Sequence, residues 1–195
     1  MYSFYSDIHK FGADPTKVEI VEGDKTFLMG DIVDLKNCLN NDYDKAKALY
    51  NDLHFKFGRR YITGNHEAMK DTDKPHFINS FTALLHGDCL IYGRQESDLV
   101  RQAKHTRGNV SRFFKKLFSK SREVVNFKAE KTPNDQIFMD AIITLKFNNP
   151  LLKRVLIGHT HILKLTKIIY PSVGIEVWFL PRGLTTFNDN EIEQY

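Results

Sequence analysis

The stretch Val155-Leu156-Ile157-Gly158-His159-Thr160-His161 takes a short apolar run directly into a glycine and two histidines. Four other apolar runs end in polar residues in the same way. They are Tyr2–Ser6 before Asp7, Thr26–Met29 before Gly30-Asp31, Arg60–Thr63 before Gly64-Asn65, and Thr82–Leu85 before His86-Gly87-Asp88. In α/β folds, ligands gather beyond the carboxyl ends of the strands, where the loops converge. The five runs therefore predict one site built from distant parts of the chain.

The segments between and after these runs predict helices and further strands, which together with the five runs indicate an α/β fold. Helical composition and spacing predict helices over 42–57 and 135–147. Residues 164–170 and 175–180 are predicted to form a closing pair of strands. The length of 195 residues fits a single domain, residues 1–195, and no internal repeat or low-complexity linker divides it.

The polar segments supply carboxylate, amide and imidazole groups. They are Asp7-Ile8-His9, Gly30-Asp31-Ile32-Val33-Asp34, Gly64-Asn65-His66-Glu67, His86-Gly87-Asp88 and Gly158-His159-Thr160-His161. Alternation along an extended backbone would put both side chains of the Asp7/His9 and His159/His161 pairs on one side. The glycines before Asp31, Asn65 and His159 would permit tight turns and close backbone approach. Mixed carboxylate and imidazole ligands suit Mn, Fe, Zn or Ni better than Ca or Mg.

Each signal taken alone has an ordinary structural explanation. A single histidine is usually a capped or surface residue, and this explanation is adopted for His54, His76 and His105. A Gly-Asn or Gly-Asp pair usually marks only a turn. Five such segments in one chain, each after a predicted strand, favour a metal site instead.

The order of the segments resembles the calcineurin-like metallophosphoesterase superfamily, whose pattern is DxH, GDxxD, GNH(D/E), H and GHxH. The resemblance extends from Asp7 to His161. It implies a four-layer αββα sandwich of two mixed sheets. It also implies two metal positions that share Asp31 as a bridging ligand. One position would be held by Asp7, His9, Asp31 and His161, and the other by Asp31, Asn65, His86 and His159.

The resemblance further implies a phosphoester hydrolase with two divalent metal ions. We expect Mn²⁺, with Fe, Zn or Ni as alternatives. The two ions would acidify a bridging water, and the resulting hydroxide would attack phosphorus in line. His66 would assist the leaving oxygen, Glu67 would help to orient His66, and Asp31 would act at the centre of the site. Asp34 has two open roles, as a partner behind the site or as the cap of the next turn.

A basic segment lies between His86 and His159, and residues 96–131 are predicted to form an amphipathic helical insert. Residues 101–131 carry ten Lys or Arg and two Glu, a net charge of +8, whereas the rest of the chain holds 18 basic and 22 acidic residues. Apolar residues recur at helical spacing, at Val110, Phe113, Phe114, Leu117 and Phe118. Three explanations remain open: a solvated cover of the core, a cap on anionic lipid, and a nucleic-acid contact.

The substrate is left open by the same features. The placement of the insert is similar to that in UDP-diacylglucosamine hydrolases, which cleave a lipid-linked pyrophosphate, but those enzymes have GNRD where this chain has GNHE. A nuclease or other nucleic-acid phosphodiesterase is a second alternative. A non-catalytic scaffold on the same fold is the least favoured, because no ligand of the pattern is missing.

Composition argues against several other classes of protein. Two cysteines, Cys38 and Cys89, stand far apart, which argues against a disulfide framework and against a zinc ribbon. No signal peptide is visible, and no run approaches the roughly 20 apolar residues of a membrane span. We therefore expect a cytoplasmic protein, with attachment to a membrane surface left open. A phosphate-ester substrate is expected, and no obligate protein partner.

Overall fold

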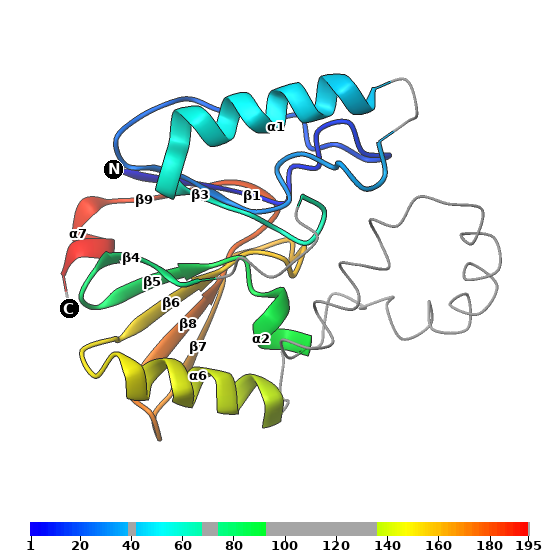
Figure 1. Cartoon of the computed structure of the whole chain (residues 1–195). Coiled ribbons are helices and arrows are strands. Elements are labelled where there is room, and N and C mark those ends of the chain that lie inside the picture. Colours follow the sequence, from blue (N-terminus) through cyan, green and yellow to red (C-terminus); the bar gives the residue numbers. More distant parts are fainter. Residues whose placement is uncertain (39–41, 68–73, 93–135, 195) are drawn as a thin grey trace, which may run out of the picture.

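The computed structural model describes residues 1–38, 42–67, 74–92 and 136–194. These residues form two mixed β-sheets with helices around them (Figure 1). The first sheet has four strands in the order β3-β2-β1-β9, and the second has five in the order β4-β5-β6-β8-β7.

Three parallel strands form the core of the first sheet. β1 (Tyr2–Ser6) pairs with β2 (Thr26–Met29), β2 pairs with β3 (Tyr61–Ile62), and β9 (Gly183–Phe187) runs antiparallel to β1. β2 and β3 are buried along their whole length, as are all but one of the residues of β1. This explains why they are near-continuous apolar runs in the sequence. Their carboxyl ends lie at one edge.

The second sheet also has three parallel strands at its centre. These are β5 (Thr82–Leu85), β6 (Arg154–Ile157) and β8 (Ile175–Phe179). The antiparallel strands β4 (His76–Asn79) and β7 (Thr166–Tyr170) form its two edges.

Buried side chains fill the spaces between four layers. The cluster between the two sheets combines Phe4 and Met29 of the first with Leu156 and Trp178 of the second. Helix α1 (Tyr43–Phe57) covers the outer face of the first sheet, and α6 (Gln136–Asn148) with α2 (Asp88–Tyr92) covers that of the second (Figure 1). The predicted α/β fold with two mixed sheets is confirmed, with helices on both outer faces.

The five predicted strands that precede the polar segments are present as β1, β2, β3, β5 and β6. The predicted helices appear as α1 and α6, and the closing pair as β7 and β8. The sequence analysis missed β4, β9, α2, the short helix α7 (Asp189–Glu193) and the 3₁₀ turn η1 (Gly58–Arg60).

The predicted basic insert, residues 96–131, lies outside the described residues. His105 lies outside them as well. Within the part of the chain that the structure describes, no helix has both the length and the apolar character needed to cross a membrane.

Candidate metal centre

The loops after β1, β2, β3, β5 and β6 meet at one edge of the sandwich (Figure 1). The structure brings all the predicted ligand residues to this edge. They form two groups with Asp31 in common, and most of their side chains are buried. The residues are Asp7, His9, Asp31, Asn65, His86, His159 and His161.

The first group consists of Asp7, His9, Asp31 and His161. One candidate ligand atom from each lies within 4.8 Å of the others. The Nε2 atom of His161 is 3.2 Å from His9 Nε2 and 3.2 Å from Asp7 Oδ1. The loop after β6 thus meets the loop after β1, across the junction of the two sheets.

The second group gathers around His86. Its Nε2 atom is 3.1 Å from His159 Nδ1, 3.3 Å from Asn65 Oδ1 and 3.5 Å from Asp31 Oδ2. Its other ring nitrogen, Nδ1, lies 2.9 Å from the main-chain oxygen of Met29. The hydrogen bond to that carbonyl holds a proton on Nδ1, so Nε2 is the nitrogen that faces the group and would bind an ion once its own proton has left.

The spacing of these atoms fits divalent metal ions. Ligand atoms about 2.1 Å from one ion lie roughly 3.0–3.4 Å from one another in tetrahedral or octahedral geometry. Asp7 Oδ1 is buried and accepts no hydrogen bond of good geometry, although it lies 3.2 Å from His161 Nε2, and a bound cation would satisfy such a buried carboxylate oxygen. The buried His/Asp cluster can therefore hold metal ions.

The backbone at the ligands differs from the extended conformation expected from the sequence. Asp7, His9, Asp31, His159 and His161 all have positive φ values, between 50° and 64°. The side chains of the Asp7/His9 and His159/His161 pairs do reach the site. The left-handed backbone conformation directs them there, and not the alternation of an extended strand. L-residues adopt this conformation at a cost of about 1–2 kcal/mol each, and such strain is concentrated at functional sites.

Two glycines allow the close approach that the sequence predicted. A Cβ atom on Gly64 would lie 2.1 Å from Asp31 Oδ1, and one on Gly30 would lie 2.3 Å from His86 Nδ1. Gly30 also has a φ of +88°, which L side chains rarely adopt. Any side chain at these positions would displace a candidate ligand.

The two candidate carboxylate ligands are ionised in spite of their burial. Burial opposes ionisation of Asp7, yet the contact with His161 outweighs it and lowers the pKa of Asp7 to about 2. Burial likewise acts against the Asp31 carboxylate. The positive charges of His66 and His86 overcome it and hold the pKa of Asp31 well below its usual value.

The histidines divide into two kinds. Burial lowers the pKa of His9 to about 4 and that of His159 to about 3, so both are neutral and able to act as ligands near pH 7. Burial acts the same way on His86, but the charge of Asp31 reverses it and raises the pKa of His86. For His161, contact with Asp7 similarly overcomes burial and raises the pKa.

His66 stands beside both groups and is held by Asp34. Its Nδ1 atom lies 2.9 Å from Asp34 Oδ1, and its Nε2 atom is 4.0 Å from Asp31 Oδ2. Asp34 also accepts hydrogen bonds from the backbone and side-chain nitrogens of Asn37, at 2.8 and 3.1 Å. Asp34 therefore fills both roles left open by the sequence: it contacts His66 and caps the next turn.

Glu67 has a different place from the one expected. Its Oε1 atom accepts hydrogen bonds from the amides of Ile32 and Val33, at 2.7 and 2.9 Å, and from the Tyr61 hydroxyl. Its Oε2 atom accepts one from the amide of Gly64 at 2.9 Å. The expectation that Glu67 orients His66 is corrected, because the partner of His66 is Asp34. Glu67 joins the loop after β2 to the loop after β3.

Burial, together with the charge of Asp31, raises the pKa of the Glu67 carboxyl to about 7.

The sequence analysis missed two residues that contact Asp7. The Ser6 hydroxyl donates to Asp7 Oδ2, and Arg182 Nε donates to the Asp7 main-chain oxygen at 2.9 Å. Ser6 is a polar residue in a buried strand, which could have singled it out. Arg182 lies in a Pro-Arg-Gly turn far along the chain, and no local pattern marks it.

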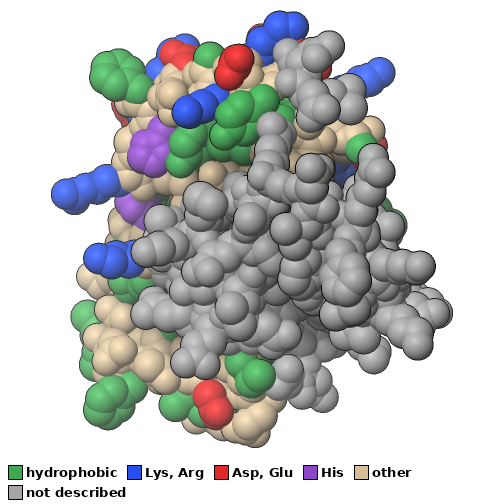
Figure 2. Space-filling view, turned by 45° about the vertical axis from the view of Figure 1, so that its right-hand side comes forward, with side chains coloured by type: hydrophobic (Ala, Val, Ile, Leu, Met, Phe, Trp, Pro, Cys, Tyr) green, Lys and Arg blue, Asp and Glu red, His purple; other side chains and the backbone are tan. Residues whose placement is uncertain are grey.

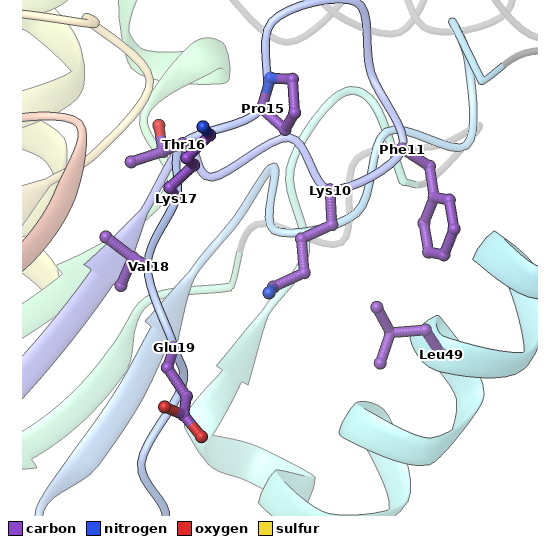
Figure 3. Close-up of a pocket in the computed structure, with 8 residues that line it drawn as sticks. All are labelled: Lys10, Phe11, Pro15, Thr16, Lys17, Val18, Glu19 and Leu49. Atoms are coloured by element: carbon purple, nitrogen blue, oxygen red, sulfur yellow. The ribbon is translucent and has the colours of Figure 1, made fainter.

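A surface hollow of about 540 Å³ lies beside the centre and contains none of its candidate ligands (Figure 3). It is bordered by the connection after His9 and by α1, through Lys10, Phe11, Pro15, Thr16, Lys17, Val18, Glu19 and Leu49. The side chains of Phe11 and Leu49 lie on one side of it, and those of Val18 and Glu19 lie on the other. In the space-filling view, Lys and Arg side chains project singly around the edge of the described surface (Figure 2).

No protein-family model matches the chain, and a search of curated proteins finds no match either. The function of the chain is therefore inferred from the geometry of the site and from the order of its residues.

Proposed function

We propose that the chain is a phosphoester hydrolase of the calcineurin-like metallophosphoesterase superfamily that depends on two divalent metal ions. The observation that carries this proposal is the pairing of two ligand groups that share Asp31, with His66 beside them. Two ions held by these groups would lower the pKa of a bound water and neutralise the phosphate oxygens. Mn²⁺ is the proposed ion.

In this proposal, His66 acts as the general acid that protonates the departing oxygen. Its Nδ1–H donates to Asp34, whose pKa is about 2 because contact with His66 outweighs the opposing effect of burial. The Asp34 carboxylate fixes the ring and keeps one proton on Nδ1, so a second proton on Nε2 can pass to a departing oxygen. His66 also lies in a third group of candidate ligand atoms, with His9 and Asp34, and the proposal assigns it to proton transfer because neither group that shares Asp31 includes it.

Elemental analysis of protein loaded with Mn²⁺ and then desalted is the first test. We expect two ions per chain for the natural sequence and fewer for Asp31→Asn, because this residue belongs to both groups. His54→Ala is the matched control, since His54 lies on α1 between aromatic rings and in neither group. Zero bound metal in the natural protein, with Asp31→Asn no different, would refute the proposal.

A substrate panel then separates the classes of ester. The Mn-loaded protein is assayed on an aryl phosphate, an aryl phosphodiester, nucleotides, a nucleotide-linked lipid pyrophosphate and single-stranded DNA. Hydrolysis of the aryl esters supports the general proposal. Strong preference for DNA would favour the nuclease alternative, and preference for the lipid would favour the pyrophosphate hydrolase. Metal binding without turnover on any of these would favour the non-catalytic scaffold.

A further inference from the structure

Arg182 lies between the two loops that supply most of the first ligand group. Its backbone N–H donates to the main-chain oxygen of Ile162, next to His161, at 3.4 Å. Its side chain turns to the other loop, where Nε donates to the Asp7 main-chain oxygen at 2.9 Å. One residue thus contacts the loop after β1 and the loop after β6.

The rest of the guanidinium is occupied by Asp14. Nη1 lies 2.8 Å from Asp14 Oδ2, and Nη2 donates to the main-chain oxygen of Asp14. The planar fork of arginine can satisfy three acceptors at fixed angles, which a lysine ammonium cannot do. Arg182 therefore fixes the connection after β1 at two points, Asp7 and Asp14.

The connection requires such support because its backbone is strained. Asp7, His9 and Phe11 have φ values of 53°, 54° and 68°, all in the left-handed region. These conformations persist only where the surrounding structure holds them. On its outer side, the connection borders the open hollow, although Ile8 and Phe11 also pack with the core cluster under α1 (Figure 3). The hydrogen bonds of Arg182 act on its inner side, where the ligands are.

We propose that Arg182, held by Asp14, is a positioning residue that sets the first ligand group for metal binding. This inference rests on the proposed metal site. It has a selective consequence, because the Arg182 side chain holds Asp7, which belongs to the first group only, whereas its contact with the loop that carries both His159 and His161 is made by the backbone N–H. Loss of the guanidinium should weaken the first metal position more than the second.

Titration of metal-free protein with Co²⁺, monitored by visible absorption, provides the test. We expect two binding steps, which His161→Ala and His86→Ala assign to the first and second groups. Arg182→Ala should weaken the first step about 10- to 100-fold, the usual effect of removing a partner behind a metal ligand. In Arg182→Lys, the affinity of the first step should lie between those of the natural protein and Arg182→Ala, because the lysine ammonium cannot reach Asp7 and Asp14 together.

Arg60→Ala is the matched control. Arg60 Nη1 donates to the main-chain oxygen of Gly23, which lies at the far end of the same β1–β2 connection. The Arg60→Ala substitution removes a similar hydrogen bond between an arginine and a main-chain carbonyl, at a place remote from the candidate ligands. Both Co²⁺ binding steps should therefore be unchanged in this variant. Circular dichroism and the midpoint of thermal unfolding verify folding. If Arg182→Ala does not fold, Arg182→Lys is measured instead and should weaken the first step more than the second.

The outcomes separate the two proposals. If the natural protein binds no Co²⁺, the metal site itself is refuted. If the natural protein binds two ions and Arg182→Ala binds both equally tightly, the positioning role is refuted while the metal site stands. Equal weakening of both steps in Arg182→Ala would also overturn the inference, because it would show a general effect on the fold.

Discussion

His66 is the one histidine at the centre that the two metal groups sharing Asp31 do not use. Its Nδ1 is held by Asp34, which leaves Nε2, 4.0 Å from Asp31 Oδ2, as the nitrogen that would protonate a leaving group in the proposed reaction. We expect His66→Ala to keep its metal and to lose activity by about 10²–10⁴-fold, the usual contribution of a general acid. Steady-state rates on phenyl phosphate, with metal content measured on the same preparation, provide the comparison.

The leaving group supplies the internal control for this variant. A nitrophenolate needs little protonation as it departs, so His66→Ala should lose much less activity on nitrophenyl phosphate than on phenyl phosphate. Asn37→Ala removes a side-chain contact of Asp34 and one of His66 but leaves the Asp34–His66 contact, and should lose less activity than His66→Ala. Full activity of His66→Ala on phenyl phosphate would show that the residue is not the acid.

Metal binding is expected to release protons near neutral pH. His86 and His161 have raised pKa values, so each carries a proton that must leave before the nitrogen can bind an ion. His9 and His159, with pKa values of about 4 and about 3, are already neutral and release none. Metal affinity should therefore rise with pH through the neutral range and fall on acidification.

Calorimetry in two buffers of different ionisation enthalpy counts these protons. We expect about one to two protons released for the pair of ions, and about one fewer in His161→Ala. His54→Ala, a histidine remote from the groups, should give the count of the natural protein. A count of zero together with affinity independent of pH would contradict the assignment of His86 and His161 as ligands.

At the scale of the elements, Glu67 joins two loops that contain ligands. Its carboxylate accepts backbone hydrogen bonds from Ile32, Val33 and Gly64, and so connects the ends of β2 and β3. Glu67→Gln places an amide NH₂ among these buried donors and leaves at least one unsatisfied. We expect a loss of about 2–3 kcal/mol in the free energy of unfolding, measured by urea titration.

Glu22→Gln is the matched control for this substitution. Glu22 forms an exposed pair with Lys56, 61% and 45% accessible, and exposed pairs contribute about 0–1 kcal/mol. If both variants were equally stable, the four hydrogen bonds of Glu67 would not be stabilising the loops.

The strands that lead to the site could be predicted from sequence because they are buried on both faces. Their apolar runs end where polar ligands begin, and the two signals coincide at Asp7, Asp31 and His86. β9 and β4 could not be found this way, because β9 alternates buried with exposed residues and β4 is a partly exposed edge strand. The left-handed backbone at the ligands leaves no local signal, since it is imposed by contacts between loops.

At the scale of the whole molecule, each ligand group joins the two sheets. The first combines the loops of β1 and β2 with that of β6, and the second combines those of β2 and β3 with those of β5 and β6. An ion that binds only the folded state would stabilise it by about 2.7 kcal/mol at a concentration of 100 times its dissociation constant. We expect Mn²⁺ to raise the thermal midpoint, and a chelator to reverse the rise. An equal shift in Asp31→Asn would show that the effect does not come from this centre.

At the scale of the whole chain, the positive charge is concentrated in one segment that contains none of the candidate metal ligands. The contribution of this charge to substrate choice can therefore be tested separately from the chemistry of the site. All the candidate ligands lie outside residues 101–131, which nevertheless carry a net charge of +8. Replacing Lys115, Lys116 and Lys120 together with Gln removes three charges and keeps the apolar residues between them. On a small aryl phosphate we expect unchanged turnover, because the metal ligands are untouched. On an anionic lipid or nucleic-acid substrate we expect a raised KM and a flatter dependence on salt, because fewer cations attract the substrate.

The same preparation can be assayed on both kinds of substrate, which makes the comparison internal. Replacing Lys45, Lys47 and Lys56 of α1 with Gln removes the same number of charges elsewhere and should leave both substrates unaffected. Equal losses on the small and the polymeric substrate would mean that residues 101–131 support the fold and do not select the substrate. No loss on any lipid or nucleic acid would mean that this charge only faces solvent. A selective loss on one of them would identify the substrate class, because only that substrate would depend on the positive charge.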